Sequence, residues 1–136
     1  MNPADFIPHR YPFLLVDKLL ALEAGTSATG VKKWSKDDPI FQGHFPGEPV
    51  VPGVLLLEAI AQVGAAAVLA QAEHKGRKAF LAKVEEARFL RVVRPEEEVK
   101  LKTTVRMLKA GFGEGIGEAL VGDEIAVKGK IIFKVV

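Results

Sequence analysis

The chain has 136 residues, the size of one ordinary domain, and a net charge of +2, too balanced to indicate a nucleic-acid-binding protein. Hydrophobic residues make up 49% of the chain and charged residues 26%, so we expect residues 1–136 to form a single domain with a packed core. Cysteine is absent, which excludes disulfides, thiolate metal sites and a thiol nucleophile.

Two strands are predicted in the first part of the chain. Residues 5–9 are expected to form one short helical turn. The mostly apolar run 12–22 then predicts a strand that ends before Gly25. Small and β-branched residues in 26–34 predict a second strand that returns along the first, and residues 37–39 mark the turn that follows.

A loop rich in proline and glycine precedes the longest helical stretch. Residues 41–52 contain three prolines and two glycines, which excludes regular structure, and an irregular segment of this length is typical of a functional loop. Pro52 suits the first turn of a helix. Residues 54–73 are rich in alanine and leucine and predict a helix of about 20 residues. The helix is apolar on almost every side, so we expect it to be buried.

The rest of the chain predicts four strands, at 79–88, 98–108, 116–121 and 124–136. Gly122-Asp123 is a plausible tight turn between the last two. The glycines at 111, 113, 115 and 117 superficially suggest a phosphate loop, but no helix follows them, so a flexible hairpin is expected instead. The order of elements predicts an α+β fold in which one antiparallel sheet wraps around the helix, and a partner chain is expected to complete the burial of that helix.

Nothing in the sequence indicates a membrane protein. The longest apolar run, 50–70, carries Glu58 and Gln62 in its middle, and these polar groups argue against a membrane span. The first ten residues lack the apolar core of a signal peptide. We therefore expect a cytoplasmic protein without membrane insertion.

Glu58 is the most informative residue, because it lies within the apolar helix between leucine, isoleucine and alanine residues. A carboxyl group is rarely buried without a partner or a purpose, and an apolar environment favours its protonated form, which a general acid needs. Gln62 lies four residues further, on the same helix face, and is expected to hydrogen-bond Glu58. The alternative is a solvated glutamate at the edge of the helix.

His44 lies in the stiff loop before the helix, and histidine is the side chain best matched to proton abstraction near neutral pH. The alternative is a histidine that only satisfies loop carbonyls. Gly53 begins the helix, where free N–H groups can polarise a substrate carbonyl, although the glycine is equally explained by turn geometry. His9 is either a packing residue or a contact in a substrate tunnel, and we favour packing; we interpret His74 as a helix C-cap. The three histidines are not spaced as metal ligands, so no metal site is expected.

The central motif resembles the signature of the β-hydroxyacyl-acyl carrier protein dehydratases, in residues 43–54 (GHFPGEPVVPGV) and 58–62 (EAIAQ). The opening at 7–17 (IPHRYPFLLVD) and the segments 80–81 and 87–89 are also similar to that family. The resemblance covers residues 7–94 and weakens after residue 91. Differences fall at 94–97 and 128–130, away from the motif.

This resemblance implies a hot-dog fold, in which a curved antiparallel sheet of about six strands wraps a long central helix. It also implies a homodimer, in some members a trimer of dimers, in which His44 of one subunit faces Glu58 of the other. Gly53 N–H would polarise the thioester carbonyl, and the glutamate at position 58 is typical of the branch that only dehydrates. No cofactor is implied.

The implied reaction removes water from a (3R)-hydroxyacyl thioester to give a trans-2-enoyl thioester, as in fatty acid biosynthesis. His44 would take the proton next to the carbonyl, and Glu58 would protonate the leaving hydroxyl. Acyl carrier protein is the expected partner, and Lys83, Arg88, Arg91 and Arg94 are its candidate docking residues unless they are merely solvated strand ends. Two alternatives remain, a hot-dog thioesterase and a non-catalytic acyl-binding protein.

Overall fold

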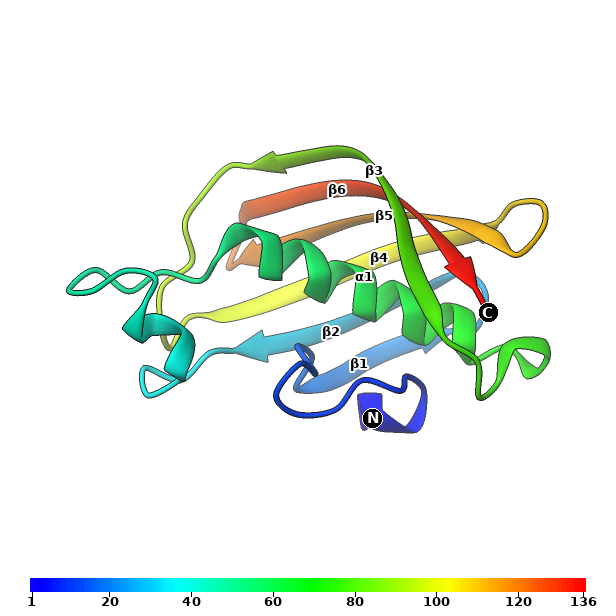
Figure 1. Cartoon of the computed structure of the whole chain (residues 1–136), viewed down its shortest axis with the longest axis horizontal. Coiled ribbons are helices and arrows are strands. Elements are labelled where there is room, and N and C mark those ends of the chain that lie inside the picture. Colours follow the sequence, from blue (N-terminus) through cyan, green and yellow to red (C-terminus); the bar gives the residue numbers. More distant parts are fainter.

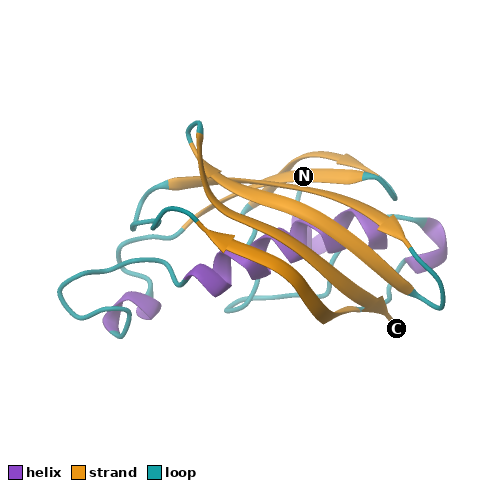
Figure 2. Ribbon diagram, turned by 90° about the horizontal axis from the view of Figure 1, so that it is seen from above, coloured by secondary structure: helices purple, strands orange, loops and turns teal.

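A computed structural model describes all 136 residues. Its helix α1 (Gly53–Leu69) lies along one face of a curved antiparallel sheet (Figure 1, Figure 2). The six strands follow the order β1-β2-β4-β5-β6-β3 across the sheet, so β1 and β3 form its edges. Their bounds are β1 (Lys18–Glu23), β2 (Ser27–Lys33), β3 (Ala79–Phe89), β4 (Glu98–Met107), β5 (Phe112–Val121) and β6 (Glu124–Val135). The predicted α+β hot-dog fold is confirmed.

Strand β4 illustrates how the sheet holds the helix. Its residues alternate between buried and exposed, and Val99, Leu101, Thr103 and Val105 are all buried in the core. A period of two is the pattern of a strand with one face on a hydrophobic core. Burying each valine or leucine contributes about 1.5–3 kcal/mol, so this one strand supplies a substantial part of the contact with α1.

Two glycines allow α1 to approach the sheet closely. Gly117 of β5 and Gly129 of β6 are paired across the sheet. A Cβ atom at Gly117 would lie 2.3 Å from Ile60 Cγ2, and one at Gly129 would lie 2.5 Å from Leu57 Cδ1. Because neither distance leaves room for a methyl group, the large side chains of α1 rest where the sheet has no side chain of its own.

This packing corrects the expected flexible hairpin at the glycine-rich segment. Strand β5 begins at Phe112 rather than at residue 116, and Gly113, Gly115 and Gly117 are strand residues in register with β4 and β6. Gly113 and Gly117 have no room for a side chain, because Phe133 of β6 and Ile60 of α1 lie over them.

Two other boundaries differ from the prediction. The first strand begins at Lys18, not at residue 12, because the backbone of Phe13 and Leu15 bonds to the side chain of Gln62 instead of a neighbouring strand. Helix α1 ends at Leu69, where the carbonyl of Ala67 accepts a hydrogen bond from the Gly25 N–H at 2.9 Å.

The short helical segments also differ from the prediction. His74 does not cap α1; it ends the 3-10 helix η3 (Ala72–His74). The expected turn at residues 5–9 is replaced by η1 (Pro3–Asp5), and η2 (Pro39–Gln42) leads into the proline-rich loop. None of the helices combines the length and the hydropathy needed to cross a membrane.

The stability of the fold should depend on Gly117. We expect Gly117→Ala to lower the free energy of unfolding by about 1–3 kcal/mol, because the new methyl group overlaps Ile60 and the Lys102 carbonyl. Gly43→Ala is the matched control, since no atom lies within 4 Å of the added Cβ. Thermal unfolding followed by circular dichroism measures both variants, and equal melting temperatures would contradict this account.

Candidate active site

Glu58 is held by Gln62, one helical turn further along α1. Gln62 Nε2 donates a hydrogen bond to Glu58 Oε2 at 2.9 Å and another to the carbonyl of Phe13 at 2.9 Å. Gln62 Oε1 accepts from the Leu15 N–H at 2.8 Å. The Gln62 side chain is only 1% exposed, so these bonds satisfy a buried amide and fix the orientation of the Glu58 carboxyl group at the same time.

His9 lies beside this carboxyl group, a contact that was not predicted from the sequence. His9 Nε2 is 3.8 Å from Glu58 Oε2, while the Nδ1 atom is buried without a hydrogen-bond partner. Desolvation by burial lowers the pKa of His9, although the charge of Glu58 opposes this shift and that of Arg10 adds to it. The ring is therefore favoured in its neutral form. The contact arises between residues 49 positions apart, so no local pattern in the sequence pointed to it.

His44 has one ring nitrogen bound and one free. The Nδ1 atom lies 2.9 Å from the carbonyl oxygen of Val50. A carbonyl only accepts hydrogen bonds, so in the neutral ring Nδ1 carries the proton and Nε2 keeps a lone pair. The Phe45 ring stacks on the imidazole, with the ring centroids 4.0 Å apart. The loop thus holds His44 in the tautomer that can accept a proton at Nε2.

Gly53 begins α1, and its N–H group donates no hydrogen bond within the chain. A Cβ atom at this position would lie 2.6 Å from Phe89 Cδ1, so close packing of Phe89 requires the glycine. Gly53, His44 and Phe89 line one largely apolar hollow of about 560 Å³, here called the His44 hollow. The start of α1 and the His44 imidazole therefore line the same space.

Glu58 does not line the His44 hollow. It lines a different hollow of about 350 Å³, together with His9, Phe13 and the start of β3. Gly53 and Glu58 are five residues apart on α1, which places them about 140° apart around the helix axis. Within one chain, the structure does not bring His44 and Glu58 together.

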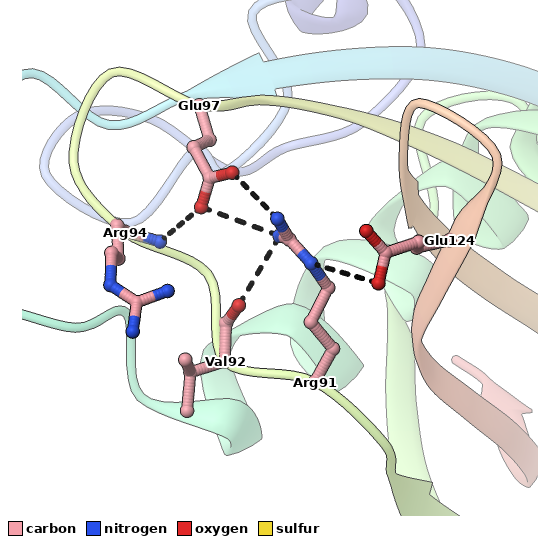
Figure 3. Close-up of polar contacts among 5 residues, drawn as sticks. All are labelled: Arg91, Val92, Arg94, Glu97 and Glu124. Atoms are coloured by element: carbon pink, nitrogen blue, oxygen red, sulfur yellow. Dashed lines mark hydrogen bonds and ion pairs between the residues drawn. The ribbon is translucent and has the colours of Figure 1, made fainter.

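Arg91 is bound within the chain, which argues against its predicted role in docking (Figure 3). Its guanidinium group contacts Glu97 Oε2 at 2.8 Å and Glu124 Oε2 at 3.6 Å. The hydrogen bond to Glu97 raises the pKa of Arg91, and the same bond lowers the pKa of Glu97. The network ties the β3–β4 connection, which lines the His44 hollow, to the start of β6.

The other candidate docking residues remain at the surface. Lys83 and Arg94 have exposed side chains without an ion pair. Arg88 is 67% exposed and contacts Glu86 at 2.8 Å, a surface pair that contributes little to stability. These three residues are therefore available to an acidic partner.

The comparisons with known proteins agree with this architecture. The model of the FabA-like domain family matches residues 7–134. Two curated relatives are 3-hydroxyacyl-[acyl-carrier-protein] dehydratases FabZ. The one from Chloroflexus aggregans is 48% identical and the match covers 95% of this chain and 90% of the relative. The one from Moorella thermoacetica is 49% identical, with the same two coverages.

Solved structures show the same fold at lower sequence identity. A dehydratase heterocomplex, ApeI:P from Xenorhabdus doucetiae, matches with a TM-score of 0.80 at 15% identity, over 98% of this chain and 90% of that one. An uncharacterised protein from Pyrococcus horikoshii matches with a TM-score of 0.70 at 15% identity, over 97% of this chain and 92% of its own. Fold and site define a protein of the hot-dog class. This chain belongs to the FabA-like domain family, and the resemblance of its central motif to the hydroxyacyl-carrier dehydratases is confirmed.

The Arg91–Glu97 pair should make stability depend on pH. The pKa of Glu97 is lowered in the folded chain, so its carboxylate stabilises the fold above the ordinary value of 4.5. This contribution is lost as the pH falls through the lowered value. We expect Glu97→Gln to cost up to about 1 kcal/mol at neutral pH, and the difference from wild type to vanish in acid.

Urea unfolding between pH 7 and pH 3 measures this difference. Glu98→Gln is the matched control, because Glu98 is exposed and forms no ion pair. A constant difference between wild type and Glu97→Gln across the whole range would contradict the assignment.

Proposed function

We propose that this protein removes water from 3-hydroxyacyl chains carried as thioesters on acyl carrier protein, in fatty acid biosynthesis. The observation that carries the proposal is the identity of 48–49% to FabZ dehydratases over 95% of the chain. The substrate is expected to be the (3R)-hydroxyacyl thioester and the product the trans-2-enoyl thioester. We expect the reaction to take place in the cytoplasm.

His44 would act as the base. Its Nε2 lone pair is free because Nδ1 is engaged by the Val50 carbonyl. The C2–H bond of the substrate breaks, the proton moves to Nε2, and the electron pair is delocalised into the thioester carbonyl. The Gly53 N–H at the start of α1 would stabilise the developing negative charge on that oxygen, and one such donor is typically worth about 10²–10³-fold in rate.

Glu58 would act as the acid. Its Oε2 atom accepts the Gln62 amide hydrogen, so in the protonated carboxyl group the proton is favoured on Oε1. That proton passes to the C3 hydroxyl group as the C–O bond breaks, and water leaves.

The separation of the two hollows supports a site shared between two chains. Strand β3 is an eleven-residue edge strand, and its side chains Phe80, Leu81, Val84 and Phe89 are exposed. A long apolar edge is a template for pairing with another strand. We propose that two copies pair along β3, so that His44 of one copy faces Glu58 of the other. Assembly into a trimer of dimers remains a prediction.

Both residues should matter strongly for turnover. General acid–base catalysis contributes about 10²–10⁴-fold, so we expect His44→Ala and Glu58→Gln each to lower kcat by at least 10²-fold. The measurement is the absorbance change on forming the enoyl thioester from a hydroxyacyl carrier substrate. Glu48→Gln, in the exposed part of the same loop, is the control that should retain activity.

Mixing the two inactive variants tests the shared site. If the dimer uses one residue from each chain, co-refolding His44→Ala with Glu58→Gln restores about a quarter of wild-type activity, because half of the dimers then hold one intact site of two. No recovery, with both variants folded and dimeric, would contradict sharing.

The turnover assay also tests the two alternative functions. Release of free thiol instead of enoyl product would indicate a thioesterase. Tight binding of the substrate without turnover would indicate a non-catalytic acyl-binding protein.

Acyl carrier protein would dock on the exposed basic residues Lys83, Arg88 and Arg94. Surface charges of this kind mainly change the association rate, so charge reversal of all three should raise KM for the carrier-bound substrate and leave kcat unchanged. Lys109→Glu, in the β4–β5 turn, is the matched control. Equal effects on a small thioester without carrier protein would show that the substitutions disturb the site itself.

A further inference from the structure

The hydrogen bond that holds His44 continues beyond the proline-rich loop. His44 Nδ1 donates to the Val50 carbonyl oxygen, with 2.9 Å between the two atoms. That carbonyl shares a peptide unit with the Val51 N–H, which donates to the Val93 carbonyl oxygen at 2.8 Å. The peptide unit that the imidazole contacts therefore also joins the loop to the β3–β4 connection.

The same arrangement is repeated at Val93. Its carbonyl shares a peptide unit with the Arg94 N–H, which donates to Glu97 Oε1 at 2.8 Å (Figure 3). Val51 and Val93 are 4% and 0% exposed, so water has little access to the bond between them. Three hydrogen bonds and two peptide units thus connect the Glu97 carboxylate to the imidazole of His44.

All the donors in this chain point the same way, toward the carboxylate. A peptide unit that donates its N–H to an anion is polarised and becomes a better acceptor at its carbonyl oxygen. The Glu97 carboxylate therefore strengthens the bond accepted by Val93, and that bond strengthens the one accepted by Val50. A gain of roughly 10–30% per bond is typical of such cooperative chains. The last bond in the chain is the one that holds His44.

Arg91 keeps Glu97 in position to end the chain. Its guanidinium group donates to Glu97 Oε2 at 2.8 Å and to the Val92 carbonyl oxygen at 3.3 Å. The hydrogen bond from Arg91, together with the one from the Arg94 N–H, lowers the pKa of Glu97. Glu97 is therefore a carboxylate at neutral pH, and the backbone on both sides of Val93 is held.

We infer that Glu97 is a positioning residue for His44 and that Arg91 orients it for this role. Its effect passes through the two intervening peptide units. The inference rests on the proposed function, in which His44 takes the substrate proton at Nε2. In the catalytic triad of serine proteases a carboxylate contacts the histidine directly and fixes its tautomer. Here the contact is indirect, so the expected effect on rate is smaller.

Removing the acceptor at position 97 should lower kcat and leave KM unchanged. A base that is less firmly oriented loses rate without loss of substrate affinity, so we expect Glu97→Ala to lower kcat about tenfold and to keep KM within about twofold. Glu97→Gln keeps an oxygen for the Arg94 N–H and should retain kcat within about threefold of wild type. Glu98→Ala is the matched control, because Glu98 is exposed and forms no ion pair.

The tautomer of the imidazole gives a readout that does not depend on turnover. Nitrogen-15 NMR at a pH where the ring is neutral distinguishes protonation at Nδ1 from protonation at Nε2, and His44→Ala identifies the signals of His44. We expect wild type to show the Nδ1–H form alone. In Glu97→Ala the Nε2–H form should become detectable, whereas Glu97→Gln and Glu98→Ala should resemble wild type.

The outcomes separate this inference from the proposed function. If wild type dehydrates no hydroxyacyl carrier thioester, the proposed function fails, while the tautomer measurement still decides whether Glu97 orients His44. An unchanged tautomer in Glu97→Ala, or an equal change in Glu98→Ala, overturns the inference even when kcat falls. Should Glu97→Ala prove unfolded in a thermal melt, Glu97→Met replaces it, because methionine keeps the length of the side chain without an oxygen acceptor.

Discussion

The close contact between α1 and the middle of the sheet is the constraint on which the rest of the structure depends. Leu57 packs directly against Gly129, and Ile60 packs directly against Gly117. These two contacts resist rotation and sliding of the helix on the sheet. Glu58 stands between these two buried residues in the sequence. Its direction is therefore set by the packing of its neighbours, and the carboxyl group emerges at the side of the helix that faces His9 and the start of β3.

The same contact divides the molecule into two regions of different chemistry. At the start of α1, Gly53 and the His44 imidazole line a wide hollow. Along the flank of α1, the Glu58 carboxyl group lies beside His9 in a second hollow. Each region contains half of what the proposed elimination requires, and the exposed edge strand β3 lies close to both through Phe89 and Leu81.

Much of this arrangement follows from local patterns in the sequence. The strand expected at residues 98–108 is β4, and the alanine and leucine content of residues 54–73 predicts α1. The spacing of Glu58 and Gln62 predicts a hydrogen bond that the structure contains. What could not be predicted depends on residues far apart in the chain. The glycines of β5 suggest a flexible hairpin in the sequence, but in the fold Ile60 packs over Gly117 and Phe133 over Gly113. The sequence favours a packing role for His9, but the fold places it next to Glu58. Arg91 was expected to be available for docking, but it forms ion pairs with Glu97 and Glu124.

The orientation of the Gln62 amide determines how the Glu58 carboxyl group is hydrogen-bonded. The orientation of this amide is fixed, because Leu15 offers it only an N–H donor and Phe13 offers it only a carbonyl acceptor. The NH₂ end must therefore point to Glu58. It follows that two main-chain groups of the N-terminal segment, 47 and 49 residues before Gln62, orient the amide so that the nearer oxygen of Glu58 acts as a hydrogen-bond acceptor. In the proposed reaction, the backbone of the N-terminal segment would thus leave the other oxygen of Glu58 to deliver the proton.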